Sequence, residues 1–164
     1  MSYIDTSVIV AALDPSDRRR DQARQILEGR EEKFISELVL AELSSVLARR
    51  KELKKLASEL GVREDLVLPA ILIYLIKRFG LIYKKVNGFV RLPAIGGLYS
   101  PMAFAVTWST KLRLRTLDMI HLAYVKIMKE EGLSVRNIVT ADEEFQKAKG
   151  ITKKKISVEV SIIR

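Results

Sequence analysis

The chain has 164 residues, 48% of them hydrophobic, which is enough to bury the core of one domain. It holds no cysteine and a single histidine, His121. Disulfide scaffolds, thiol nucleophiles and metal sites built from several cysteines or histidines are therefore excluded. Lys and Arg number 29 against 20 Asp and Glu, and the net charge of +9 favours a polyanionic partner such as nucleic acid. Any chemistry must depend mainly on carboxylates.

The apolar runs are too short to predict a membrane protein. The longest, Leu66 to Ile76, has 11 residues and is interrupted by Pro69, whereas crossing a bilayer takes about 20. The first residues lack the basic start and long apolar stretch of a secretory signal. We therefore expect a cytoplasmic protein with no membrane partner.

Apolar periodicity and turn residues predict short strands that alternate with helices. In the first half, the pattern predicts a strand at 3–4, a strand or helix over 8–13, a helix over about 17–28, a strand over 32–35, and helices over 37–47, 53–60 and 63–79. In the second half, it predicts a β-hairpin over 81–92 turning at Asn87-Gly88, a loop through Gly96-Gly97, helices from Ser100 and Thr116, a strand over 137–140, a helix over 141–149 closed by Gly150, and a strand over 157–163.

This alternation is typical of an α/β fold. We expect a three-layer sandwich in which helices flank a central, mainly parallel sheet. No linker or internal repeat divides the chain, so residues 1–164 are expected to form a single domain. The hairpin and the loop after it form an insertion at about 81–97.

Four acidic residues stand at strand ends or on helix faces that should be apolar. Asp5 and Asp142 each follow a short strand, at the edge where open α/β sheets bind ligands. Glu42 lies among apolar residues at helical spacing, and Asp118 shares a helix face with apolar neighbours. Each has an ordinary alternative: a helix cap for Asp5 and Asp142, the helix dipole for Asp118 and a boundary position for Glu42.

If the four carboxylates converge, they need a divalent cation, because clustered carboxylates repel one another. Mg²⁺ and Mn²⁺ prefer oxygen ligands, and such ions are the usual device for in-line phosphoryl transfer. A basic protein around an acidic pocket suits a phosphodiester substrate. Mutual repulsion also predicts that Glu42→Gln keeps or raises the stability of the protein.

Four segments resemble the motifs of PIN-domain nucleases, with the VapC-like toxins as the nearest likeness. They are Ile4-Asp5-Thr6-Ser7-Val8, Leu40-Ala41-Glu42-Leu43, the run from Arg115 to Ala123 around Asp118, and the run from Val139 to Phe145 around Asp142. The resemblance implies an Mg²⁺- or Mn²⁺-dependent endoribonuclease. Its catalytic and metal-binding residues would be Asp5, Glu42, Asp118 and Asp142, supported by the hydroxyls of Thr6 and Thr140.

The partners to expect from the resemblance are RNA, a cognate antitoxin and a second copy of the chain in a homodimer. Two alternatives stay open: a non-catalytic module that binds RNA or protein, and a housekeeping RNA-processing nuclease, which the insertion favours. A phosphatase of the haloacid type fits poorly, because Asp5-Thr6-Ser7 lacks a second Asp two residues on. His121 lies one turn after Asp118 and is expected to be structural or to pair with that residue.

Overall fold

Five short parallel strands form the central sheet of the protein, in the order β3-β2-β1-β6-β7. A computed structural model describes all residues 1–164. The strands of this sheet are β1 (Ser2–Ile4), β2 (Lys33–Ile35), β3 (Leu81–Tyr83), β6 (Asn137–Thr140) and β7 (Glu159–Ile162). The predicted α/β sandwich with a central parallel sheet is confirmed.

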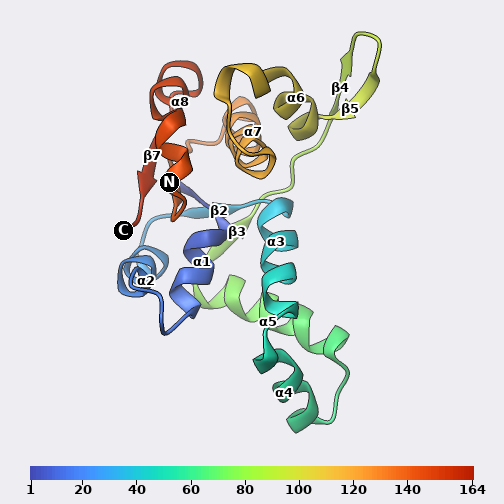
Figure 1. The fold of residues 1–164 in the computed structure, drawn as a ribbon, viewed down its shortest axis with the longest axis vertical. Coiled ribbons are helices and arrows are strands. Elements are labelled where there is room, and N and C mark those ends of the chain that lie inside the picture. Colours follow the sequence, from blue (N-terminus) through green and yellow to red (C-terminus); the bar gives the residue numbers. More distant parts are fainter.

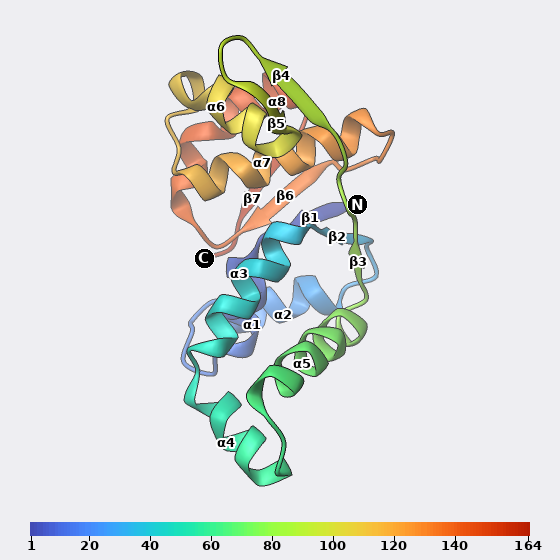
Figure 2. The same cartoon turned by 90° about the vertical axis from the view of Figure 1, so that its right-hand side faces the viewer.

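Helices cover both faces of the sheet. In Figures 1 and 2, α6, α7 and α8 lie on one side, and α1, α2 and α5 on the other. The helices are α1 (Thr6–Leu13), α2 (Arg20–Glu28), α3 (Glu37–Ala48), α4 (Lys51–Leu60), α5 (Glu64–Arg78), α6 (Ser100–Leu112), α7 (Thr116–Glu130), the 3-10 helix η1 (Glu143–Ala148) and α8 (Lys149–Ile156). None of them has the length and apolar composition that a bilayer crossing requires.

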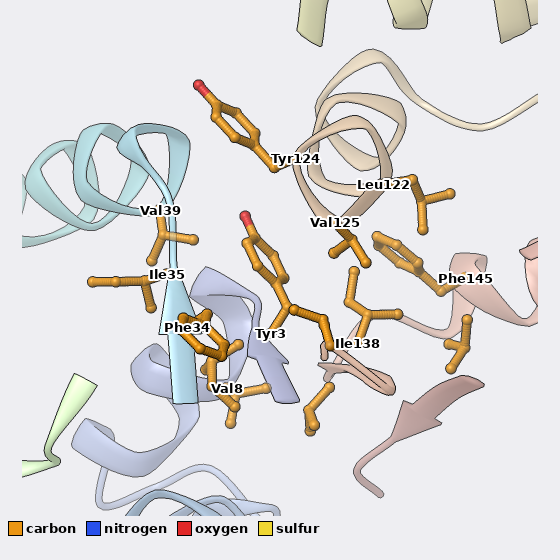
Figure 3. Close-up of a cluster of buried hydrophobic side chains, with 14 of the residues drawn as sticks. Tyr3, Val8, Phe34, Ile35, Val39, Leu122, Tyr124, Val125, Ile138 and Phe145 are labelled. Atoms are coloured by element: carbon orange, nitrogen blue, oxygen red, sulfur yellow. The ribbon is translucent and has the colours of Figure 1, made fainter. Parts of the chain in front are cut away.

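One core of 37 buried hydrophobic residues joins the two helical layers through the sheet. Tyr3 and Ile4 of the central strand β1 are fully buried, as expected for a parallel strand covered on both faces. Figure 3 shows Tyr3 between α3 and α7, with Val125 and Ile138 packed beside it. The core thus fixes β1, α3 and α7 relative to one another.

The hairpin differs from the one that the sequence predicts. Leu81–Tyr83 is not a hairpin arm, because it pairs in parallel with β2 and forms the edge of the central sheet. The hairpin is instead β4 (Phe89–Leu92) with β5 (Gly96–Tyr99), so the segment expected as a Gly96-Gly97 loop is a strand. Its turn lies at Pro93–Ile95, where Ala94 takes a positive φ of 63°. Pairing in the central sheet buries Leu81, which the local Asn87-Gly88 signal could not reveal.

The C-terminal helical region also differs from the prediction. The expected helix over 141–149 is the 3-10 helix η1, and α8 continues through Gly150 instead of ending there. Ile156, near the end of α8, is buried against the core, so continuing the helix gains apolar burial that outweighs the low helix propensity of glycine. Ser157, with φ of 54°, ends the helix.

Candidate metal centre

The parallel sheet brings the sequence-predicted acidic residues toward one edge. Asp5 follows β1, and Asp142 lies two residues beyond the end of the adjacent strand β6. Glu42 is in the second turn of α3, which follows β2, and Asp118 is in the first turn of α7. The carboxyl ends of neighbouring parallel strands therefore meet where α3 and α7 flank them.

Asp5 is held by three polar side chains and is almost fully buried, with 6% of its surface exposed. Its Oδ2 accepts hydrogen bonds from Ser7 Oγ at 2.6 Å and Thr140 Oγ1 at 2.5 Å. Its Oδ1 lies 3.1 Å from Nε2 of His121. The side chain makes no capping bond to α1, so the alternative of a simple helix cap does not describe Asp5.

Glu42 points toward the same place from α3. Its Oε2 accepts hydrogen bonds from Thr6 Oγ1 at 2.5 Å and from His121 Nε2 at 3.0 Å. Burial pushes the pKa of Glu42 upward, but the hydrogen bond and charge of His121 and the Thr6 hydroxyl outweigh burial and leave this pKa below its ordinary value. The expectation that Glu42→Gln keeps or raises stability stays a prediction, and the contacts of Glu42 with Thr6 and His121, which favour the carboxylate, argue against it.

His121 joins the two carboxylates, a role that the sequence does not predict. It is 2% exposed, and its Nδ1 lies 2.8 Å from the hydroxyl of Tyr3, which in turn is 2.7 Å from Ser36 Oγ. Burial lowers the pKa of His121, but Asp5 and Glu42 outweigh burial and raise it, which favours the imidazolium. In this form Nε2 donates toward both carboxylates and Nδ1 donates to Tyr3.

The sequence missed these contacts because it offered only the spacing of His121 from Asp118. The structure instead pairs His121 with residues 116 and 79 positions away in the chain. Ser7 is a second missed residue, since its hydroxyl binds Asp5 and accepts a bond from the backbone N–H of Ala141 at 2.9 Å. The hydroxyl run of Thr6 and Ser7 directly after Asp5 was the available signal.

Asp118 carries the uncompensated charge of the site. It is 8% exposed, and its Oδ2 is buried with no hydrogen-bond partner. Burial, followed by the negative charges of Asp142 and Asp5, raises the pKa of Asp118 to about 6. A buried carboxyl group without a donor is costly, so this oxygen is poised for a cation.

Asp142 stands at the rim. Its Oδ1 accepts from the backbone N–H of Glu144 at 2.8 Å and caps η1, which is the ordinary alternative that the sequence left open. Its Oδ2 lies 3.7 Å from Arg115 Nη1. Its backbone N–H donates to Thr140 Oγ1 at 3.0 Å, so Thr140 links Asp142 to Asp5. Asp142 therefore influences the centre mainly through its charge.

The donor set fits a divalent cation. Carboxylate oxygens of Asp5 and Glu42 lie within 4.8 Å of each other, and Asp118 adds a buried oxygen without a donor. Protonated His121 has no free lone pair, so it positions these carboxylates and is not a ligand. Oxygen-rich sets of this kind suit Mg²⁺ and Mn²⁺. Open α/β proteins bind their ligands at the carboxyl ends of the parallel strands. The fold and the position of the acidic centre therefore define an α/β protein that acts on a ligand at this edge of the sheet.

Comparison with known proteins agrees with this class. Residues 2–87, just over half of the chain, match the PIN domain family model. The chain belongs to the PIN domain family. The match includes Asp5 and Glu42 and ends before Asp118 and Asp142. No curated protein sequence matches the chain.

Three solved structures share the fold. VapC20 of Mycobacterium tuberculosis, a toxin that cleaves the sarcin-ricin loop, is 20% identical with a TM-score of 0.57 over 90% of this chain and 95% of its own. VapBC2 of Rickettsia felis, bound to promoter DNA, is 15% identical with a TM-score of 0.55 over all of both chains. FitAcB of Neisseria gonorrhoeae is 19% identical with a TM-score of 0.56 over 98% and 96%. At these identities the likeness shows the fold.

Proposed function

We propose that the protein is a cytoplasmic endoribonuclease that depends on Mg²⁺ or Mn²⁺ and hydrolyses RNA phosphodiester bonds. One observation carries the proposal: carboxylate oxygens of Asp5 and Glu42 lie within 4.8 Å of each other, and Oδ2 of Asp118, one turn before the His121 that contacts both, is buried with no hydrogen-bond partner. Membership of the PIN domain family supports a nuclease, and the net charge of +9 supports a polyanionic substrate.

In this proposal the metal ligands are Asp5, Glu42 and Asp118, with Asp142 acting from the rim. A divalent cation bound there would activate water and neutralise the charge that develops on the phosphate. Thr6, Ser7 and Thr140 orient the carboxylates through their hydroxyls. His121 holds Asp5 and Glu42 in place through Nε2.

The test is cleavage of a fluorophore-quencher RNA by the purified protein with Mg²⁺ or Mn²⁺, with and without a chelator. We expect Asp118→Asn to lower the rate at least about a hundredfold, the scale of a lost catalytic group. The matched control is Asp65→Asn, which removes one exposed carboxylate outside the centre. Cleavage in chelator, or full activity of Asp118→Asn, would overturn the proposal.

Metal binding has a second readout that does not depend on activity. We expect Mn²⁺ to raise the melting temperature of the wild-type protein, because a ligand that binds only the native state stabilises it. Asp118→Asn should lose most of this rise and Asp65→Asn should keep it. Mn²⁺ binding without RNA cleavage would favour the non-catalytic RNA- or protein-binding module.

We further propose that the protein is the toxin of a toxin–antitoxin pair. An apolar groove of about 900 Å³ lies between α1, α3, α4 and α5, and 15 of its 18 lining residues are hydrophobic. Leu60, Leu66 and Tyr74 on this groove are each more than 60% exposed, which is typical of an interaction surface. A structure from Klebsiella pneumoniae, 13% identical with a TM-score of 0.52 over 88% of this chain and 90% of its own, is a toxin–antitoxin complex, so an antitoxin is the occupant we propose.

Expression of the chain in a bacterial host tests this role. We expect growth arrest that the product of the adjacent gene relieves. The double variant Leu60→Asp/Leu66→Asp should stay toxic but escape relief, whereas Ile73→Asp, at an exposed apolar residue of α5 outside the groove lining, should still be relieved. Absence of arrest by an active nuclease would favour a housekeeping RNA-processing enzyme.

The proposal also expects a homodimer, measurable by light scattering, because Met102 and Val106 leave apolar surface exposed on α6.

A further inference from the structure

Positive charge is concentrated in one part of the chain. Residues 66–117 contain eight basic residues and no acidic residue, whereas the other 112 residues hold 21 basic and 20 acidic side chains. Nearly the whole net charge of +9 therefore belongs to the stretch from α5 to the start of α7. The eight residues are Lys77, Arg78, Lys84, Lys85, Arg91, Lys111, Arg113 and Arg115.

Most of these cations have no anionic partner within the protein. Arg78 pairs with Glu28 at 2.9 Å, and Arg115 lies 3.7 Å from Asp142. The other six form no ion pair; Lys84 among them is half-buried and the rest are exposed. Unpaired like charges on one stretch create a positive potential that attracts an external polyanion.

Three of the unpaired cations lie on an arm that begins beside the acidic centre. We call residues 84–99 the basic arm; it includes Lys84, Lys85 and Arg91 and ends in the β4–β5 hairpin. The arm leaves the carboxyl end of β3, and Asp5 leaves the carboxyl end of β1 at the same sheet edge. Only β2 separates these strands, so their ends are about 10 Å apart. Figures 1 and 2 show the hairpin projecting from the body of the molecule.

The base of the arm is fixed to the two helices that carry the centre. The hydroxyl of Tyr99 donates to the Val86 carbonyl at 2.8 Å, and the Val86 N–H donates to Glu37 Oε1 at 3.3 Å. Glu37 begins α3, the helix of Glu42. The Tyr99 hydroxyl also lies 3.5 Å from that of Tyr124 on α7. The arm therefore starts from a defined position relative to the carboxylates.

A second basic segment lies at the opposite end of the centre. Arg113 and Arg115 are exposed in the loop before α7, and Arg115 comes three residues, about one turn, before Asp118. Along the axis of α7, Arg115, Asp118 and Tyr124 follow in this order over about 14 Å. Along this axis the acidic centre therefore lies between the basic α6–α7 loop and Tyr124, which contacts the base of the arm.

The hairpin also exposes an aromatic ring. Phe89 is 77% exposed and packs edge-on against Tyr99, with 6.2 Å between the ring centroids. Exposed aromatic rings next to cations are the usual platform on which bases of a single strand stack.

We propose that single-stranded RNA binds across the acidic centre, with the basic arm holding the strand on one side and the α6–α7 loop holding it on the other. Lys84, Lys85 and Arg91 contact phosphates, and Phe89 stacks on a base. The choice of RNA rests on the proposed function, but the placement of the strand rests on the charges and contacts of the arm.

The test is fluorescence anisotropy with a labelled oligouridine in chelator, so that binding is measured without cleavage. The arm variant is Lys84→Ser/Lys85→Ser/Arg91→Ser. The control is Lys51→Ser/Lys54→Ser/Lys55→Ser, which removes the same charge from exposed positions on α4 at the other end of the molecule. We expect the arm variant to weaken binding about tenfold or more. The slope of log K against log[salt] should fall by about 2, since each phosphate contact on a single strand contributes about 0.7.

The control variant should keep an affinity within about twofold of wild type, and Phe89→Ala should weaken binding about tenfold. Equal losses in the arm and α4 variants would overturn the proposal, because the effect would then follow net charge alone. If the arm variant kept its RNA affinity but changed the mass of the protein in light scattering, the arm would be a protein interface, and this result would also overturn the proposal. If RNA binding depends on the arm but the protein does not cleave RNA with Mg²⁺ or Mn²⁺, the proposed nuclease activity is contradicted and this inference stands.

Discussion

The acidic centre and the apolar groove of α4 and α5 differ in the contacts that the rest of the protein makes with their side chains. At the centre, hydroxyls and an imidazole contact Asp5 and Glu42, and the surrounding residues belong to the main core. The α4–α5 end has a separate buried cluster of only Leu53, Ala57 and Val67. The centre is fixed by long-range contacts and leaves a charge uncompensated, whereas the groove leaves apolar surface exposed. Each region therefore needs a different external partner.

Paired truncations should show the largest difference between the two regions. Leu122 on α7 is fully buried in the main core, so Leu122→Ala should lower the free energy of unfolding by about 3–4 kcal/mol. Leu53→Ala should cost about 1–2 kcal/mol, because its small cluster borders solvent. Urea denaturation measures both values. Hydrogen exchange should show that α4 opens at a lower free energy than α7. Equal opening free energies of the two helices would contradict the difference between the two regions.

Neutralising Asp118 should stabilise the protein in metal-free buffer. Because the pKa of Asp118 is raised from 3.8 to about 6 in the folded state, its ionisation disfavours folding. The penalty is absent below about pH 4, builds as pH rises toward 6 and is complete above it. Asp118→Asn should therefore gain about 2–3 kcal/mol at pH 7 and almost nothing near pH 4. Thermal melts across this pH range measure the gain, and a gain that does not depend on pH would refute the cause.

Removing the Tyr3 hydroxyl should have a smaller effect at the centre. Tyr3→Phe leaves buried His121 Nδ1 without its partner, and a lost buried hydrogen bond of this kind costs about 1–2 kcal/mol. The control is Tyr74→Phe, since Tyr74 is 62% exposed at the groove. Urea denaturation should separate the two variants. Equal stability of the Tyr3 and Tyr74 variants would show that the hydroxyl chain does not stabilise the centre.

The smallest effect is expected from a surface ion pair at the groove end. Arg63 and Asp65 lie 2.5 Å apart, but their side chains are 81% and 57% exposed. Water and salt screen such pairs, so Arg63→Ala should leave the melting temperature within about 1 °C of wild type. A drop of several degrees would mean that charge, and not apolar packing, holds α4 and α5 together.

The sequence by itself predicted the α/β class, because apolar periodicity is local and identifies short buried strands and amphipathic helices without knowledge of their partners. It also pointed to Glu42 and Asp118, since a carboxylate on an apolar face can be seen within one turn of helix, and to Asp5, since it directly follows a buried strand. The first residues of each helix were less certain, but the order of strands and helices was largely as predicted.

Only the tertiary structure decided which residues meet. Leu81–Tyr83 joined β2 in the central sheet instead of a local hairpin, because burial in the sheet outweighs a turn signal. Asp142 became a rim residue and His121 the link between Asp5 and Glu42. Tyr3 and His121 are 118 positions apart, and no local pattern encodes a contact at that separation. The physical reason is that strand pairing and side-chain convergence depend on the packing of the whole core.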